Sequence, residues 1–198
     1  MENKRKIATD IDEVLIDFGT PIREYYNKRF GTNLTHGDYR YYDLDRVWGT
    51  TKQRATEIVL DFYKTEEFTN MLPTLGAQEV IRKLSEKYEL RAINSRPHEL
   101  ERDTLISLHR YFGNTFTEVF HNGQHGLHSF GLDKSGYCLQ NGIFVILEDN
   151  LDIARKCAEK GIEVILFDKL WNESLPIPGI TRVGINNNPW QDVLEILK

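Results

Sequence analysis

The chain has 198 residues, a length typical of one domain of about 150 residues that carries an insertion. Apolar residues make up 40% of it and aromatic residues 11%, which is enough to form a core and excludes a disordered chain. The net charge of −5 argues against a protein that coats nucleic-acid polymers, because such proteins present a basic face.

No apolar run approaches the roughly 18–20 residues that a membrane span needs. The start of the chain, MENKRKIATD, is basic but lacks the apolar stretch that is typical of a secretory signal peptide. We therefore expect a soluble, cytoplasmic protein that has no membrane partner.

Short apolar runs alternate with amphipathic segments of helical length along most of the chain. Strands are predicted at 6–10, 88–94, 116–122, 143–149 and 163–168. Helices are predicted at 20–31, 51–64, 76–87, 97–112, 133–141 and 149–161. This alternation is typical of βαβ units. We therefore predict an α/β fold with a doubly wound, Rossmann-like, mostly parallel sheet of about five strands.

The alternation is interrupted between the first strand and residue 76, where no convincing strand pattern occurs. This part of the chain holds the first two helical patterns and, between them, a loop rich in Tyr and Asp at 35–50. A connection of this length is more than a loop. We predict a small helical cap at 18–72, inserted after the first strand into an α/β core made of 1–17 and 73–198.

The cysteines and three histidines receive structural interpretations. Cys138 and Cys157 are isolated from each other in the sequence, so we expect buried, reduced thiols in helices. His121, His125 and His128 have irregular spacing around a glycine, which favours a solvated or pocket-edge loop over a metal site.

The C-terminal part of the chain has two further features. NNNPW at 186–190 is typical of a helix start, with Pro189 at the first helical position. TRV at 181–183 and Trp171 are interpreted as residues that pack at the C-terminal edge.

Carboxylates gather at the predicted ends of two strands. Asp10 and Asp12 end the first strand, and Glu148 and Asp149 end the fourth. Ligands of doubly wound sheets bind beyond the carboxyl ends of the strands, so we expect these acids to converge. Buried acids are costly without a cation, and a few carboxylates with waters suit Mg²⁺. The sequence therefore predicts a Mg²⁺ site.

Other polar residues fit the same place. Asn94, Ser95 and Arg96 follow the second strand. Lys134 begins a predicted helix 14 residues before Glu148, where its ammonium can stabilise a phosphoryl group and balance the acids. A second D-x-D pair, Asp43 and Asp45, lies in the predicted cap and is interpreted as a solvated turn.

These motifs resemble those of the haloacid dehalogenase (HAD) superfamily, mainly its phosphatases. TDIDEVLIDF at 9–18 resembles the first motif, INSRP at 93–97 the second, Lys134 the third and LEDN at 147–150 the fourth. Order and spacing agree over roughly residues 6–168, and the insertion has the position of a C1-type cap.

The resemblance implies a role for each motif residue. Asp10 matches the nucleophile, which forms an aspartyl-phosphate, and Asp12 matches the acid/base. The metal ligands would be Asp10, Asp149, Glu148 directly or through water, and the backbone carbonyl of Asp12. Halide release needs no proton donor, so an acid at the position of Asp12 favours a phosphatase over a dehalogenase.

Within the superfamily, the chain most resembles the 5′(3′)-deoxyribonucleotidases. DIDEVLIDF at 10–18 and the PTLGA segment at 73–77 carry this finer resemblance, and Phe18 matches a phenylalanine that lines the substrate pocket. The resemblance implies a small phosphorylated substrate, most readily a nucleoside monophosphate. Aromatic faces on which a base can stack are offered by Tyr39, Tyr41, Tyr42 and Trp48, for which packing inside the cap is the alternative.

The second motif departs from the pattern, because relatives have Thr or Ser where Asn94 stands. Either the amide of Asn94 or the hydroxyl of Ser95 takes the role of phosphate donor. Arg96 and His98 either reach the pocket or lie at a helix surface. Two other functions stay open: a sugar-phosphate phosphatase or phosphomutase, and a catalytically weak, ligand-binding relative. The sequence also leaves a homodimer open.

Overall fold

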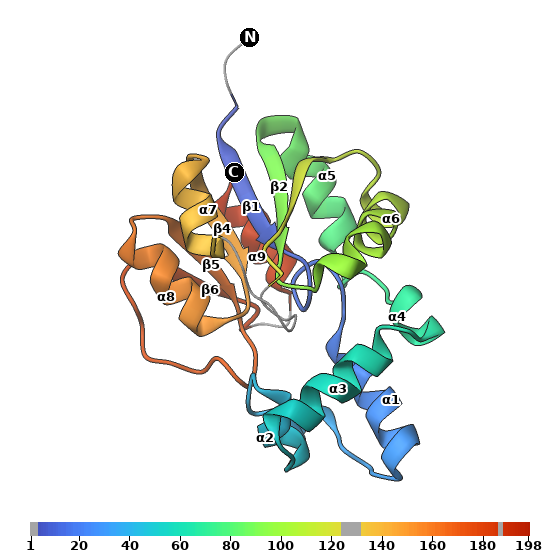
Figure 1. Cartoon of the computed structure of the whole chain (residues 1–198). Coiled ribbons are helices and arrows are strands. Elements are labelled where there is room, and N and C mark those ends of the chain that lie inside the picture. Colours follow the sequence, from blue (N-terminus) through green and yellow to red (C-terminus); the bar gives the residue numbers. More distant parts are fainter. Residues whose placement is uncertain (1–3, 124–131, 186–187) are drawn as a thin grey trace.

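The computed structural model of the chain describes residues 4–123, 132–185 and 188–198. Its centre is a parallel sheet with the strand order β3-β2-β1-β4-β5-β6 (Figure 1). The strands are β1 (Lys6–Asp10), β2 (Glu89–Asn94), β3 (Phe116–His121), β4 (Ile143–Glu148), β5 (Glu163–Phe167) and β6 (Ile180–Val183). This order confirms the doubly wound, Rossmann-like fold. The first five strands lie where the apolar runs predicted them.

The sixth strand was not predicted, so the expectation of about five strands falls one short. β6 contains the TRV segment and pairs with β5 in parallel, from Val164 opposite Ile180 to Phe167 opposite Val183. It has only four residues, of which Thr181 is exposed. A strand this short has too weak a periodic pattern to be identified, and only its pairing with β5 defines it.

Helices cover both faces of the sheet (Figure 1). Alternate side chains of β4 show this: Val145 and Leu147 pack in one buried cluster and Ile146 in the other. The first cluster includes residues of α5 (Ala77–Lys87), α6 (Glu101–Phe112) and α9 (Pro189–Ile196), and the second of α7 (Lys134–Gln140) and α8 (Leu151–Glu159). Among the described residues, no helix is both long and apolar enough to cross a membrane.

Several local predictions are confirmed by these elements. Cys138 and Cys157 are free, buried thiols on α7 and α8. Pro189 is the first residue of α9, although Asn186 and Asn187 of the same motif lie outside the described residues. The segment 97–112 forms a short 3₁₀ turn, His98–Leu100, followed by α6.

The insertion after β1 is helical, as predicted. It contains α1 (Gly19–Phe30), a 3₁₀ turn (His36–Asp38), α2 (Leu44–Trp48), α3 (Lys52–Phe62) and α4 (Glu66–Thr69), and lies to one side of the sheet (Figure 1). The prediction of a loop at 35–50 was wrong for Leu44–Trp48, which form helix α2. The α2 helix ends at Gly49 in the left-handed conformation and buries Trp48 in a stack on Tyr26, with ring centroids 4.4 Å apart.

Two backbone crossings join the insertion to the core, and they lie side by side. The Asp17 N–H donates to the Leu72 carbonyl, and the Thr74 N–H donates to the Leu15 carbonyl, both at 2.9 Å. The domain boundaries at 17/18 and 72/73 remain a prediction, and they fall on these crossings. Their pairing fixes the point at which the cap leaves the end of β1.

Candidate active site

Three carboxylates converge beyond the adjacent strands β1 and β4. Asp10 is the last residue of β1, Glu148 is the last residue of β4, and Asp149 follows it. Each offers one oxygen, and these oxygens lie within 4.8 Å of one another. All three residues are buried. The carboxyl ends of neighbouring parallel strands therefore bring together acids that are far apart in the sequence.

Lys134 lies against this carboxylate cluster. It is the first residue of α7, whose N-cap residue Asp133 accepts a hydrogen bond from the Gly136 N–H. Its Nζ is 2.6 Å from Asp10 Oδ2 and 3.0 Å from Glu148 Oε2. Burial alone lowers the pKa of the Lys134 ammonium, but these two carboxylates raise it above its usual value. The side chain is therefore a fixed cation on the floor of the site.

The acids of the cluster are crowded. Burial, with the neighbouring charges of Asp10 and Asp149, raises the pKa of the Glu148 carboxyl well above its usual range. Burial, with the charges of Asp10 and Glu13, raises the pKa of Asp149 to about 8. Three carboxylates face one ammonium, so two negative charges remain when all are ionised. This donor set fits a hard divalent cation that binds oxygen ligands.

Asp12 lies outside this cluster and is held by Arg96. The Arg96 Nε is 2.9 Å from Asp12 Oδ2 and its Nη2 is 2.6 Å from Asp12 Oδ1, which makes a two-pronged ion pair. Arg96 Nη1 also donates to Thr104 Oγ1 at 3.0 Å. Arg96 is almost fully buried and does not line the pocket. Its guanidinium therefore contacts Asp12 and is not exposed to a substrate in the pocket. The predicted substrate-binding arginine lies behind the predicted acid/base.

Asn94 and Ser95 have different surroundings. The Asn94 Oδ1 accepts from the Arg96 N–H at 3.0 Å, and its Nδ2 is 3.1 Å from His121 Nδ1. Asn94 is not among the residues that line the pocket, whereas Ser95 is. The Ser95 hydroxyl is buried and has no hydrogen-bond partner among the residues that the structure describes. His98 is exposed, and His125 and His128 lie outside the described residues.

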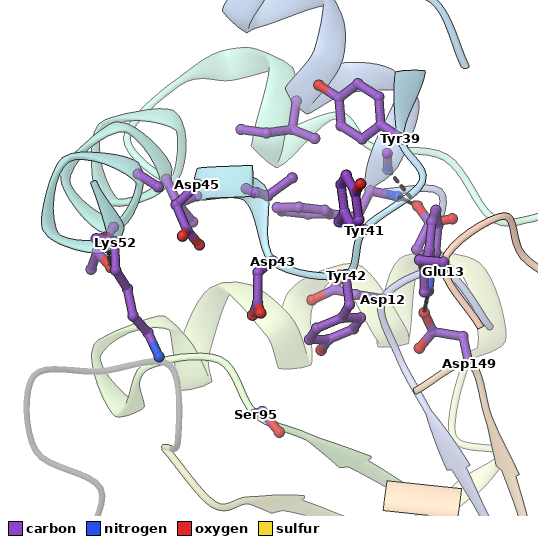
Figure 2. A pocket seen from close by; sticks show the side chains of 18 of the residues that line it. Asp12, Glu13, Tyr39, Tyr41, Tyr42, Asp43, Asp45, Lys52, Ser95 and Asp149 are labelled. Atoms are coloured by element: carbon purple, nitrogen blue, oxygen red, sulfur yellow. Dashed lines mark hydrogen bonds between the residues drawn. The ribbon is translucent and has the colours of Figure 1, made fainter. Parts of the chain in front are cut away.

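A pocket of about 230 Å³ lies between the core and the helical insertion. Asp10, Asp12, Ser95, Lys134 and Asp149 line it from the core. In Figure 2, Tyr39, Tyr41, Tyr42, Asp43, Asp45 and Lys52 extend into it from the cap side. Apolar wall residues from the cap include Phe18, Ile22, Ala55, Val59, Leu60 and Tyr63. The pocket therefore joins a charged floor to a largely aromatic and aliphatic wall.

Of the aromatic residues predicted to contact the substrate, all but Trp48 line the pocket. Phe18 and Tyr42 line the pocket, with Tyr39 and Tyr41 beside them. Trp48 does not: its ring stacks on Tyr26, and its Nε1 donates to the Tyr39 hydroxyl at 3.3 Å. Trp48 thus packs behind a wall residue.

The structure also shows pocket residues that the sequence interpretation missed. Trp171 was assigned to edge packing, but it lines the pocket, and its Nε1 donates to Asp149 Oδ2 at 3.1 Å. Asp43 and Asp45 were interpreted as a solvated turn. Asp43 is exposed and is the N-cap residue of helix α2, Asp45 lies in the first turn of that helix, and both line the pocket. Trp171 follows β5 closely, so the strand-end rule that identified the acids applied to it as well. No sequence signal identified Lys52.

The fold and its carboxylate cluster place the chain in a known class. The chain has the fold of solved haloacid dehalogenase-like hydrolases. Residues 4–118 match the family model described as 5′ nucleotidase, deoxy (pyrimidine), cytosolic type C protein (NT5C). These residues make up more than half of the chain, so the chain belongs to the NT5C family.

Solved structures support the fold. A haloacid dehalogenase-like hydrolase from Streptococcus pneumoniae is 15% identical, with a TM-score of 0.70, and 100% of each chain is covered. The HAD hydrolase YfnB from Bacillus subtilis, described as bound to magnesium, is 14% identical, with a TM-score of 0.65 and the same coverage. A predicted phosphoglycolate phosphatase from Haemophilus somnus is 13% identical, with a TM-score of 0.64 and 98% of each chain covered. No curated protein matches the chain.

Proposed function

We propose that the chain is a Mg²⁺-dependent phosphomonoesterase that acts on nucleoside monophosphates in the cytoplasm. The observation that carries the proposal is the buried cluster of Asp10, Glu148, Asp149 and Lys134, of which all but Glu148 line the pocket. The name of the NT5C family, which includes both nucleotidase and cytosolic, supports the substrate class and the compartment. The magnesium bound to the Bacillus subtilis relative supports the choice of cation.

The positions of the side chains support the proposed ligands and roles. Asp10, Glu148 and Asp149 would hold Mg²⁺. The resemblance to HAD phosphatases implies the backbone carbonyl of Asp12 as a further ligand. When bound, Mg²⁺ supplies the positive charge that offsets repulsion between the Asp10 carboxylate and an anionic phosphate. Lys134 keeps Asp10 and Glu148 in place and offers a second positive charge to the phosphoryl oxygens.

The reaction proceeds in two displacements. An Asp10 oxygen attacks phosphorus, the bond to the ester oxygen breaks, and Asp12 gives a proton to the departing alkoxide. Asp12 then takes a proton from water, whose oxygen attacks the phosphorus of the aspartyl-phosphate and releases phosphate. Asp10 and Asp12 both line the pocket, so one bound substrate can meet both carboxylates.

The cap side of the pocket suits a base. Phe18, Tyr39, Tyr41 and Tyr42 present rings to the pocket, and stacking of a base on such rings contributes about 1–3 kcal/mol. Trp48 acts through packing behind Tyr39 in this proposal. The substrate is thus held by its phosphate at the floor and by its base at the wall.

A substrate panel tests the function. Phosphate release is measured with Mg²⁺ on dUMP, dTMP, their ribose counterparts and a set of sugar phosphates. Turnover of nucleotides with the highest kcat/KM supports the proposal. Turnover of sugar phosphates alone replaces it with a sugar-phosphate phosphatase or phosphomutase. No release from any substrate, including an aryl phosphate, replaces it with a ligand-binding relative.

Ser95, rather than Asn94, is expected to donate a hydrogen bond to the phosphate. Ser95→Ala should lower kcat/KM about 10²-fold, because a donor to the charged phosphoryl group is lost from a buried site. Asn94→Ala should affect stability more than turnover, because Asn94 contacts His121 and the Arg96 backbone. Steady-state kinetics and urea unfolding of both variants check this. The opposite pattern would assign the role to Asn94.

The effect of Mg²⁺ on stability is expected to increase with pH. The folded Asp149 carboxyl has a pKa of about 8, above that of the unfolded chain, so the folded state holds this proton more tightly. The contribution of Asp149 to the stability of the cation-free chain is therefore greatest in acid and is lost as the pH rises through that value. Thermal unfolding with and without Mg²⁺ should show a larger increase in Tm at pH 8.5 than at pH 6. An equal increase at both would contradict the crowding of these acids.

A further inference from the structure

The segment that follows β5 contacts the carboxylate cluster. Trp171 Nε1 donates to Asp149 Oδ2 at 3.1 Å, and Asn172 Nδ2 donates to the Asp149 carbonyl at 2.7 Å. Asn172 is fully buried and also donates to the Phe167 carbonyl at 2.8 Å. Both the side chain and the backbone of Asp149 are thus held by this segment. An indole N–H can only donate, so the Asp149 oxygen that it faces acts as the acceptor.

The same segment reaches the first turn after β1. The Lys169 Nζ is 2.7 Å from Glu13 Oε2 and 5.6 Å from the centroid of the Trp171 ring. Both side chains of this ion pair are largely buried. Lys169 therefore links two groups. It lies near the Trp171 ring, which donates a hydrogen bond to Asp149, and it pairs with Glu13, a carboxylate beside the cap.

Glu13 in turn holds the start of the first cap helix. Its Oε1 accepts hydrogen bonds from the N–H groups of Phe18 and Gly19, at the N-terminus of α1. A carboxylate is favoured there by the free N–H groups and the helix dipole. A Cβ atom on Gly19 would lie 2.8 Å from this oxygen, so a larger residue there would displace the Glu13 carboxylate from its present position. Figure 2 shows Glu13 and Asp149 on the same side of the pocket.

The backbone at Glu13 indicates that this arrangement is under constraint. Glu13 has φ of 64°, a left-handed conformation, and it is the only non-glycine residue with positive φ among those described. Such a conformation is unfavourable for a residue that carries a Cβ atom, and it persists when surrounding contacts hold it. Those contacts include the Glu13 N–H bond to the Ile16 carbonyl at 2.8 Å, the ion pair to Lys169 and the two hydrogen bonds from α1.

We propose that Trp171 and Lys169 are positioning residues that couple cation binding at Asp149 to the first turn of cap helix α1. The inference rests on the cation site of the proposed function. A cation that fixes Asp149 also fixes Trp171, and through it Lys169, Glu13 and the α1 N-terminus. Coupling between two sites is reciprocal, so a loosened contact in this series weakens both cation affinity and the order of the cap turn.

Two variants separate the steps of this series. Trp171→Phe keeps an aromatic ring and removes the N–H donor, and Lys169→Met keeps most of the side-chain length and removes the charge. Lys64→Met is the matched control, because Lys64 pairs with Asp61 on the exposed face of the cap. Circular dichroism and Tm establish that each variant is folded. Lys169→Arg serves as the conservative variant that should restore the coupling.

The readouts need no substrate. Mg²⁺ affinity is measured by titration calorimetry, and hydrogen exchange of the peptide that contains Phe18 and Gly19 is measured with and without Mg²⁺. Trp171→Phe should raise the Kd about 10-fold, as loss of a hydrogen bond to a metal ligand commonly does. Lys169→Met should remove the Mg²⁺-dependent protection of the cap peptide, and Lys64→Met should change neither.

The outcomes distinguish this inference from the proposed function. An unchanged Kd in Trp171→Phe, or unchanged protection in Lys169→Met, overturns the coupling and leaves the proposed phosphatase standing. If the unsubstituted chain binds no Mg²⁺, the cation site is overturned, and the coupling fails with it. An effect of Lys64→Met as large as that of Lys169→Met assigns the change to the general loss of a positive charge, which also overturns the coupling.

Discussion

Asp10→Asn is expected to reduce phosphate release by roughly 10³-fold or more on every substrate that the unsubstituted chain hydrolyses. An amide has nearly the same shape as the carboxylate but is a far weaker nucleophile, so no aspartyl-phosphate forms. The structure places Asp10 in the pocket, with one oxygen 2.6 Å from the Lys134 ammonium. Phosphate release at saturating substrate, with Mg²⁺ present, measures the effect.

The matched control is Asp103→Asn. Asp103 lies exposed in the first turn of α6, outside the pocket, and the same substitution there should leave turnover unchanged. Trapping of labelled phosphate on the protein after rapid acid quench should be seen with the unsubstituted chain and lost in Asp10→Asn. Retained activity in Asp10→Asn would require a different nucleophile and would contradict the aspartyl-phosphate mechanism.

Arg96→Met is expected to destabilise the fold by about 2–4 kcal/mol. The substitution removes both hydrogen bonds to Asp12 and the bond to Thr104, and all of them come from a buried guanidinium. Asp12 keeps part of its surface in water, so the loss falls below that of a fully buried pair. Urea unfolding measures the change. Arg96→Lys should recover only part of it, because an ammonium lacks the two-pronged geometry.

Arg96→Met should also change how kcat/KM depends on the leaving group of the substrate. Without Arg96, the Asp12 carboxylate loses the contact that sets its position, so protonation of a departing alkoxide becomes inefficient. Aryl phosphates depart as stable phenolates and need little protonation. Arg96→Met should therefore lower kcat/KM about 10²-fold more on alkyl than on aryl phosphates. Thr104→Val is the control, since it removes a contact of Arg96 but not its pair with Asp12. Equal losses on both substrate types would leave Arg96 with a structural role alone.

Much of the fold could be predicted because its signals are local. The run IFVIL at 143–147 is apolar throughout, as a strand covered on both faces must be, and it forms β4. Asp10 and Glu148 could be placed together because both end parallel strands, whose carboxyl ends share one edge. β6 and α2 escaped prediction because elements of four and five residues carry too little periodicity.

The pairing of Arg96 with Asp12 could not be predicted, since the two residues are 84 positions apart. Nor could the choice between Asn94 and Ser95. Successive side chains of an extended chain point in opposite directions, so a difference of one position separates a pocket residue from one that bonds to His121. Trp48 was predicted to face the pocket but packs inside the cap, and Trp171 was predicted to pack at an edge but lines the pocket. The sequence could not separate these environments, because aromatic side chains suit a core and a pocket equally well.

The sequence by itself determined the class of fold, the helical insertion after β1 and the residue types that form the carboxylate cluster. These follow from the pattern of apolar runs and from the chemistry of acids at strand ends. Only the tertiary structure decided which side chains face the pocket and which of them hold the others in place. Those facts depend on the direction of individual side chains and on contacts between distant segments, such as that of Lys169 with Glu13, which no local pattern records.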